Sequence, residues 1–270
     1  MQYYLDGSGW PVHPATLKWM RAGEHFRVLD QAVAAFQAAN SAPYYLDVDG
    51  EDGRLVYRRG PLTLLPATVG LIFGDVVQNL RACLDHIIYA ISLRATSDPA
   101  GCEFPIFEYP TTGPDHRGFD PYGRRKIRFL PAEVQDVVES LQPYYPLIPS
   151  VTRPFVRHPL WDLHQIANID KHRQIPLLVT VAEAQMVEVQ APTPLTENPL
   201  PPVHWFGPAL RENDPIVSVP LPRDDLSFKP SITVQVMIDA PGISPQPVVT
   251  LSRRLVEHVS WVVGRMRPYL

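Results

Sequence analysis

The sequence predicts an α+β protein, a helical bundle with a β-hairpin and a small antiparallel sheet in the C-terminal half. The 31 prolines leave Pro-free windows that outline the elements, because proline is disfavoured inside helices and central strands. The longer windows repeat apolar residues at helical spacing. After residue 177 the pattern changes to short β-branched runs between Pro-rich turns, which indicates strands.

The composition favours one globular α+β domain over 1–270. Apolar residues make up 45% and charged residues 19%, which argues against extensive disorder. The net charge of −4 excludes a strongly basic nucleic-acid-binding protein but is compatible with a local basic patch. We see no secretory signal and no apolar window near the ~18 residues of a membrane span. A cytoplasmic protein without a membrane partner is therefore expected.

The elements follow from the Pro-free windows in chain order. Helical spacing of apolar residues defines the helices, and two strand-like runs around an Asp/Gly-rich turn are typical of a hairpin. The predicted elements are a mainly helical part over 15–175 with helices 15–40, 67–95, 132–141 and 160–173 and the hairpin 44–59, an irregular insertion over about 96–130, a Pro-rich antiparallel β part over 177–240, and a C-terminal helix 248–267 that returns to the bundle. The predicted core includes Phe26, Leu29, Val33, Leu80, Leu84, Ile87, Ile91, Leu163, Ile166, Leu255 and Val259. The Pro-rich segment 190–202 is expected to be an extended connector, and its role stays open.

The helix over 67–95 carries the first candidate motif, Asn79-Leu80-Arg81-Ala82-Cys83-Leu84-Asp85-His86. Its apolar residues fall on one face, whereas Asn79, Asp85 and His86 fall on the other. Arg81 and Asp85 are four residues apart and can pair. A histidine near its ordinary pKa of ~6.5 can transfer protons at neutral pH, and an arginine beside it can hold a phosphate group.

The spacing of Arg81 and His86 resembles the motif of the HEPN superfamily, small helical domains of prokaryotic toxins, defence proteins and RNA-processing enzymes. The resemblance implies a metal-independent endoribonuclease with Arg81 and His86 as catalytic pair and Asn79 or Asp85 in support. His86 would assist attack of an RNA 2′-OH on the adjacent phosphodiester, and Arg81 would stabilise the phosphorane. Such sites usually form across a dimer, so RNA and a second copy of the chain are the implied partners.

A structural interpretation of the same motif stays open. On a straight helix Arg81 and His86 point about 140° apart, so they converge only through a kink or across a dimer. In the structural interpretation Arg81 and Asp85 form a surface ion pair, and His86 bonds a neighbouring helix.

The predicted helix over 160–173 carries the second motif, which ends in Asn168-Ile169-Asp170-Lys171-His172-Arg173. Its apolar stripe is separate from a row of polar residues at helical spacing. The candidate binding residues are His164, Asn168, Asp170, Lys171, His172 and Arg173. Cations near the C-terminal end are also favoured by the helix dipole, so capping alone explains part of the pattern.

The two motifs together resemble those of a widespread, poorly characterised group of bacterial and phage proteins. Its shared segments correspond here to Asn79–His86, Phe104-Pro105-Ile106, Leu141-Gln142-Pro143-Tyr144 and Asn168–Arg173. The resemblance implies a bacterial protein and no established activity.

Three interpretations of the paired motifs remain. The first is a phosphate or nucleic-acid site built from Arg81, His86, Lys171, His172 and Arg173. The second is a metal site of a hydrolase, using His164 and His172 with His86 or Asp85. The third is a non-catalytic binding or regulatory module, in which Asp85, His86, Asp170 and His172 form a polar network between helices.

Several signals that define other classes of protein are missing from the sequence. It has no phosphate-binding glycine motif and no zinc-type cysteine spacing, so the favoured function is expected to need no cofactor and no metal. The metal-dependent hydrolase stays the second alternative, although His164 and His172 lie about 12 Å apart along a straight helix. The basic run Arg124-Arg125-Lys126-Ile127-Arg128 is expected in a solvated loop, from which it could contact phosphates. The function favoured at this point is the HEPN-like ribonuclease.

Overall fold

The computed structural model describes the chain outside six short segments, over residues 4–5, 11–49, 54–145, 157–190, 203–220 and 227–270. The protein is α+β, as predicted. Its contacts divide the chain into two compact units, a helical unit (Met1–Asp30, Thr68–Pro176 and Ile238–Leu270) and a sheet unit (Gln31–Ala67 and Leu177–Met237). The single domain over 1–270 stays a prediction.

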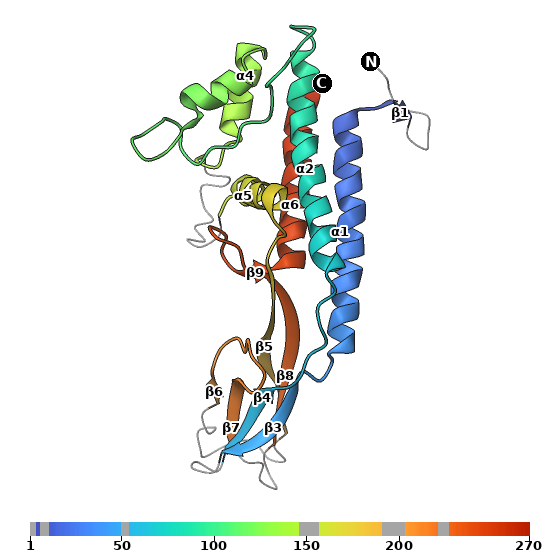
Figure 1. The fold of residues 1–270 in the computed structure, drawn as a ribbon, viewed down its shortest axis with the longest axis vertical. Helices are drawn as coiled ribbons and strands as arrows, with labels where there is room; N and C mark the ends of the chain where they lie inside the picture. The colour runs from blue at the N-terminus through green and yellow to red at the C-terminus, as the bar shows by residue number, and fades with distance from the viewer. Residues whose placement is uncertain (1–3, 6–10, 50–53, 146–156, 191–202, 221–226) are drawn as a thin grey trace. The chain divides into compact units, whose positions relative to one another are not determined.

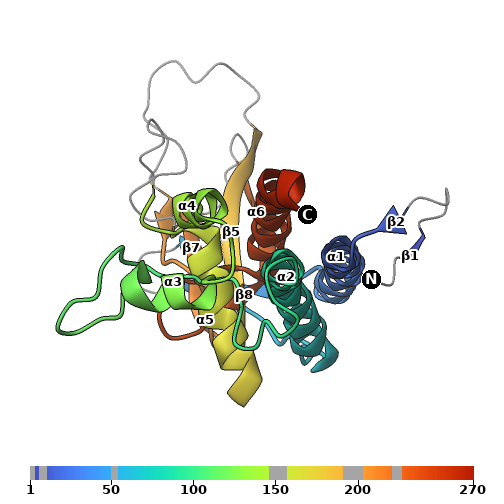
Figure 2. The same cartoon turned by 90° about the horizontal axis from the view of Figure 1, so that it is seen from above.

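The helical unit is built on four helices whose predicted bounds are close to the observed ones. They are α1 (Pro14–Ala39, of which residues 14–30 belong to this unit), α2 (Thr68–Ser92), α5 (Pro159–His172) and α6 (Val248–Met266). Helices α2, α5 and α6 pack against one another. Figures 1 and 2 show α2 and α6 side by side, with α5 crossing them.

The apolar faces predicted from the sequence form the core of this unit. Leu80, Leu84 and Ile87 of α2 are completely buried, as are Leu163 and Ile166 of α5. All the other predicted core residues are buried as well, except Phe26. That ring is half-buried on α1 and has the Arg253 guanidinium 6.0 Å from its centroid, so its inclusion in the core was wrong.

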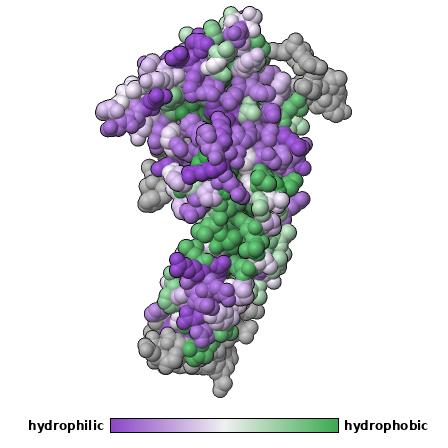
Figure 3. Space-filling view, viewed as in Figure 1, coloured by the Kyte–Doolittle hydropathy of each residue, from purple (hydrophilic) through white to green (hydrophobic). Residues whose placement is uncertain are grey.

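The insertion between α2 and α5 contains more helix than the sequence indicated. It includes a π-helical turn η1 (Phe119–Gly123), the short α3 (Arg124–Lys126) and the predicted short helix, α4 (Ala132–Ser140). The basic run therefore begins on a helical turn, so its placement in an open loop was wrong. Figure 3 shows a mostly hydrophilic surface over this part of the helical unit. Near the N-terminus, β1 (Tyr4–Leu5) and β2 (Pro11–Val12) form a minimal antiparallel pair.

The sheet unit confirms the predicted hairpin, made by β3 (Tyr44–Asp49) and β4 (Arg54–Arg59). Two later strands, β7 (Pro215–Pro220) and β6 (His204–Trp205), extend it into a four-stranded sheet of order β3-β4-β7-β6. The other two strands of this unit, β5 (Leu177–Gln190) and β8 (Ser227–Ile238), pair in a second sheet. The two-residue strand β9 (Gln246–Pro247) belongs to the helical unit. The strands from residue 177 onward are thus divided between two sheets.

Two further sequence expectations concern the Pro-rich connector and the absence of a membrane span. Residues 191–202 of the Pro-rich connector lie outside them. Among the helices that the structure describes, none combines the length and apolar character needed to cross a bilayer.

Candidate functional site

The first motif forms a buried polar contact between α2 and the insertion. Arg81 Nη2 donates hydrogen bonds to Asp85 Oδ1 at 2.8 Å and to the carbonyl oxygen of Phe104 at 2.7 Å. Asp85 Oδ1 also accepts from the backbone N–H of Phe104 at 3.0 Å. Arg81 is 8% exposed whereas the side chain of Asp85 is 31% exposed, so their ion pair is half-buried and Arg81 is its buried member. The insertion covers Arg81 through Phe104, and the helical pattern of α2 alone cannot predict this cover.

Burial raises the pKa of Asp85, while the charge of Arg81 opposes the increase. Arg81 Nη1 is buried and has no hydrogen-bond partner among the described residues. An unpaired guanidinium N–H in such a place is costly unless another group binds it. The network of Arg81 is therefore incomplete on one side.

Gln142 holds the same insertion segment from the opposite side. Its Oε1 accepts from the backbone N–H of Phe107 at 3.0 Å, and its Nε2 donates to the carbonyls of Pro105 and Val138 at 2.9 and 3.0 Å. The side chain is completely buried. Residues 104–107 are thus fixed between α2 and Gln142, the second residue after the end of α4, which gives the Phe-Pro-Ile and Leu-Gln-Pro-Tyr segments a structural role.

Replacing Gln142 by Leu is expected to lower the free energy of unfolding by about 2–4 kcal/mol, because it leaves buried backbone groups of Pro105 and Phe107 unpaired. Urea denaturation measures this change. Gln135→Leu is the matched control, since that half-buried side chain makes one bond, to the carbonyl of Leu130. Equal losses of the free energy of unfolding for the two variants would show that the three hydrogen bonds of Gln142 contribute no more than the single bond of Gln135.

A cleft of about 980 Å³ opens beside this network, entirely within the helical unit. Its basic lining residues are Arg117, Arg125, Lys126, Arg128, His116 and His164. Its aromatic lining residues are Phe107, Tyr109, Tyr122 and Trp161. Two carboxylates, Glu108 and Asp115, also line it. Four permanent cations against two carboxylates leave the cleft wall positively charged.

The cations of the cleft differ in how they are paired. Lys126 Nζ lies 2.5 Å from Glu103 Oε1. Arg125, Arg128 and Arg117 form no ion pair with any carboxylate among the described residues, and Arg128 instead donates to the carbonyls of Arg125 and Ala100 at 3.0 and 2.8 Å. The Arg117 guanidinium lies 4.9 Å from the Tyr122 ring centroid. These arginines remain available to an anionic ligand.

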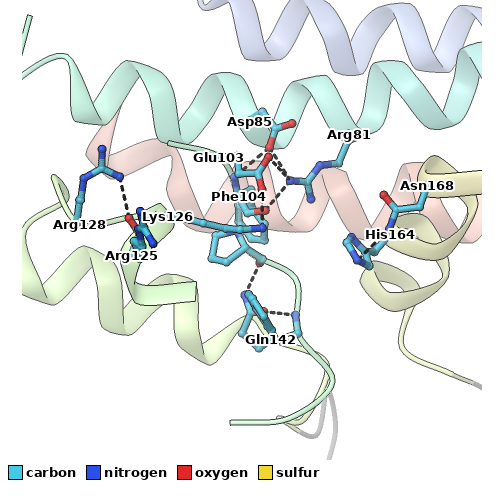
Figure 4. A network of polar contacts seen from close by, with 12 residues as sticks. Arg81, Asp85, Glu103, Phe104, Arg125, Lys126, Arg128, Gln142, His164 and Asn168 are labelled. Atoms are coloured by element: carbon cyan, nitrogen blue, oxygen red, sulfur yellow. Dashed lines mark hydrogen bonds and ion pairs between the residues drawn. The ribbon is translucent and has the colours of Figure 1, made fainter. Parts of the chain in front are cut away.

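The second motif contributes Trp161 and His164 to the cleft. His164 lines it beside Trp161, with ring centroids 5.6 Å apart, and its Nε2 is 3.1 Å from Asn168 Nδ2. Burial, followed by the charges of Arg81 and Lys126, lowers the pKa of His164 to about 4, so the ring is neutral at pH 7. Figure 4 shows Arg81, Lys126 and His164 around the same region.

The other residues of the second motif lie elsewhere on α5. Asp170 Oδ2 accepts from Gln78 Nε2 of α2 at 2.8 Å, which is an interhelical bond of the kind predicted. Lys171, His172 and Arg173 are exposed. The charge of Lys171 still contributes to lowering the pKa of His164 and of Glu103.

His86 and Asn79 do not join Arg81 in this structure. His86 lines a mainly apolar pocket of about 430 Å³ with His13, Tyr89 and Cys102. With Asn79 it also lines a smaller pocket on the side of Lys18. Arg81 is directed instead at the insertion, in keeping with the angular separation expected on a straight helix.

A second buried polar cluster joins α5 to α6. Asp162, 1% exposed, pairs with Arg254, and the rings of His158 and His258 are 4.8 Å apart. His158 Nδ1 accepts from the backbone N–H of Leu160 at 3.2 Å and caps α5. Burial lowers the pKa of His158 to about 3 and that of His258 to about 4.

Sequence reasoning missed most of the cleft. Tyr109, Tyr122 and Phe107 of the aromatic wall gave no recognisable pattern, because irregular backbone of the insertion brings them together. The signals available in the sequence were the basic run and His164 of the second motif. Among the described residues, no three histidine, cysteine or carboxylate side chains are grouped so as to hold a metal ion.

Comparison with known proteins does not add a relative. No family model, no curated protein and no solved structure matches the chain. The function must therefore be argued from the cleft and the residues around it.

Proposed function

We propose that the protein binds single-stranded RNA in the cleft of the helical unit. The observation that carries the proposal is a positively charged cleft of about 980 Å³ that combines arginines free of carboxylate partners with four aromatic side chains. Phosphate groups are bound by arginine through charge-assisted hydrogen bonds. Unpaired bases stack on aromatic side chains, and single strands offer such bases whereas duplexes do not.

The distribution of charge favours this location over the rest of the chain. The protein has a net charge of −4, so binding of a polyanion requires a local concentration of cations. Arg117, Arg125 and Arg128 provide it on the cleft wall, beside Tyr109 and Tyr122, which are 42% and 39% exposed. Exposed rings next to guanidinium groups that have no carboxylate partner among the described residues fit the alternating base and phosphate of a strand.

Ribonuclease activity stays a prediction from the spacing of Arg81 and His86. The observed positions favour a supporting role for Arg81, since its guanidinium binds Asp85 and Phe104. Incubation of wild type and His86→Ala with RNA in excess EDTA tests it, with 2′,3′-cyclic phosphate ends as the expected product of wild type alone. Intact RNA with both proteins would remove the ribonuclease proposal and leave RNA binding unaffected.

The homodimer and the cytoplasmic location implied by the sequence also stay proposals. Sedimentation equilibrium of the purified chain measures the first, with twice the 30.4 kDa of one chain as the expected mass. A mass of one chain at all concentrations would contradict it.

Binding is expected to be specific for single strands and to weaken with salt. Fluorescence anisotropy of a short single-stranded RNA should show a dissociation constant that rises with KCl, with a log–log slope of about 2, corresponding to roughly three phosphate contacts. The duplex of the same sequence is the control and should bind at least about tenfold more weakly, because its bases cannot stack on the cleft. No binding, or binding indifferent to salt, would refute the proposed function.

A further inference from the structure

Two cations and a neutral histidine lie around an incomplete hydrogen-bond network in the region of α2, α3 and α5. Arg81 comes from α2, Lys126 from α3 and His164 from α5, and Figure 4 shows them around one region. Lys126 and His164 line the cleft, whereas Arg81 lies behind it, 8% exposed. Arg81 Nη1 is the buried donor that no described residue satisfies.

The charges of these residues act on one another. Both Arg81 and Lys126 lower the pKa of His164, which places all three in the same electrostatic environment. Lys171 adds positive charge, and the carboxylates that act on these residues are Asp85 and Glu103. Glu108 and Asp115 also line the cleft, but neither forms an ion pair with Arg81 or Lys126. Asp85 is already bound by Arg81 Nη2 and the backbone of Phe104. That leaves Glu103 as the carboxylate that neutralises the remaining charge.

Glu103 has the features of an anion that another anion can replace. Its Oε1 lies 2.5 Å from Lys126 Nζ, and its Oε2 lies 3.9 Å from Arg81 Nη2. Its side chain is 44% exposed, so it can turn into solvent without leaving a buried charge unpaired. Burial alone would raise the pKa of Glu103, but the hydrogen bond and charge of Lys126, with the charges of Arg81 and Lys171, lower it.

We propose that Arg81 and Lys126, bordered by His164, form a subsite for a terminal phosphate monoester of the bound strand, and that Glu103 occupies the subsite when no ligand is bound. This proposal rests on the RNA-binding cleft. A chain end fits better than an internal phosphodiester, because Arg81 is 8% exposed and is not among the residues that line the cleft, so a phosphate must leave the path of the strand to reach it. A monoester also carries more charge than a diester, about −1.5 to −2, which favours it in competition with a carboxylate.

The test uses one single-stranded RNA sequence in three forms, with a 5′-phosphate, with a 3′-phosphate, and with hydroxyl groups at both ends. Dissociation constants are measured by calorimetry without a fluorescent label. One phosphorylated form is expected to bind wild type about tenfold more tightly than the hydroxyl form, in proportion to one additional charge-assisted contact pair. The form that gains affinity identifies which end enters the subsite.

Three variants separate the subsite from general attraction. Glu103→Gln should increase the preference for the phosphorylated RNA about threefold or more, because the competing carboxylate is gone. Lys126→Gln should abolish the preference. Arg117→Gln, the matched control on the cleft wall, should weaken all three RNAs alike and leave their ratio unchanged.

Failure of the subsite and failure of the proposed function give different results. Equal dissociation constants for the three RNAs would overturn the subsite while leaving the RNA-binding cleft in place. A preference unchanged by Glu103→Gln and Lys126→Gln would also overturn it, and would reduce the Glu103–Lys126 pair to a structural contact. Absence of binding by all three forms would overturn the proposed function itself.

Discussion

Replacing Arg125 and Arg128 together by glutamate is expected to weaken binding of single-stranded RNA by about 100-fold or more. Each guanidinium that contacts a phosphate through charge-assisted hydrogen bonds contributes about 1.5–3 kcal/mol, and charge reversal adds repulsion to this loss. Both residues are exposed, so the folded structure should tolerate the change. Anisotropy at low salt measures the dissociation constant, and circular dichroism verifies the fold.

The matched control for this variant is Arg21→Glu with Arg27→Glu. These arginines are exposed on α1 and do not line the cleft, and their replacement changes the net charge by the same amount. The control is expected to weaken binding only a few-fold through long-range electrostatics. Similar losses in both double variants would mean that the protein attracts RNA without using the cleft.

Acidification from about pH 7 to about pH 4.5 is expected to lower the free energy of unfolding by several kcal/mol. Burial lowers the folded-state pKa of His158 to about 3 and those of His164 and His258 to about 4, from 6.5. Below the histidine pKa of the unfolded state, about 6.5, the unfolded chain binds protons that the folded chain does not bind. The free energy of unfolding therefore decreases as the pH is lowered. Each histidine contributes about 2 kcal/mol over this range, together comparable with the ~5–15 kcal/mol of a typical domain.

Two carboxylates act in the opposite direction. Burial raises the folded-state pKa of Asp85 and Asp162, although their arginine partners oppose it. The folded chain therefore takes up their protons at a higher pH than the unfolded chain does, which adds some stability at the acidic end. The net change remains a loss, because burial lowers the pKa of three histidines to about 3 or about 4.

The double variant His158→Asn with His258→Gln should flatten the pH dependence of the free energy of unfolding. Asparagine keeps a side chain suited to capping α5, and neither replacement titrates in this range. His204→Gln, on an exposed strand, controls for loss of a histidine as such. Chemical denaturation at several pH values gives the comparison. A double variant as acid-sensitive as wild type would show that other groups cause the loss.

The sequence located the helices well because their apolar residues repeat along one face. Leu80, Leu84 and Ile87 are buried where helical spacing placed them. The pairing of β4 with β7 could not be predicted, since Leu55 and Val219 are partners across most of the chain and alternation within each strand does not specify a partner. Pattern within an element determines its buried side, whereas contacts between distant elements depend on the whole fold.

The candidate site was predicted less well for the same reason. The bond from Arg81 to Asp85 follows from helical spacing, but its burial depends on residues 103–107, which lie on irregular backbone. Gln142 belonged to a segment noted only by resemblance, and its three bonds to the backbone appear only in the folded chain. His86 lies on the same helix as Arg81 but lines other pockets.

The most direct test of the RNA-binding cleft is photocrosslinking of single-stranded RNA containing 4-thiouridine, followed by mass spectrometry of the crosslinked peptides. The expected result is crosslinks to the aromatic wall, at Tyr109, Tyr122 or Trp161, which the Arg125→Glu and Arg128→Glu double variant greatly reduces. Crosslinks concentrated in the sheet unit, or around His86, would contradict the account.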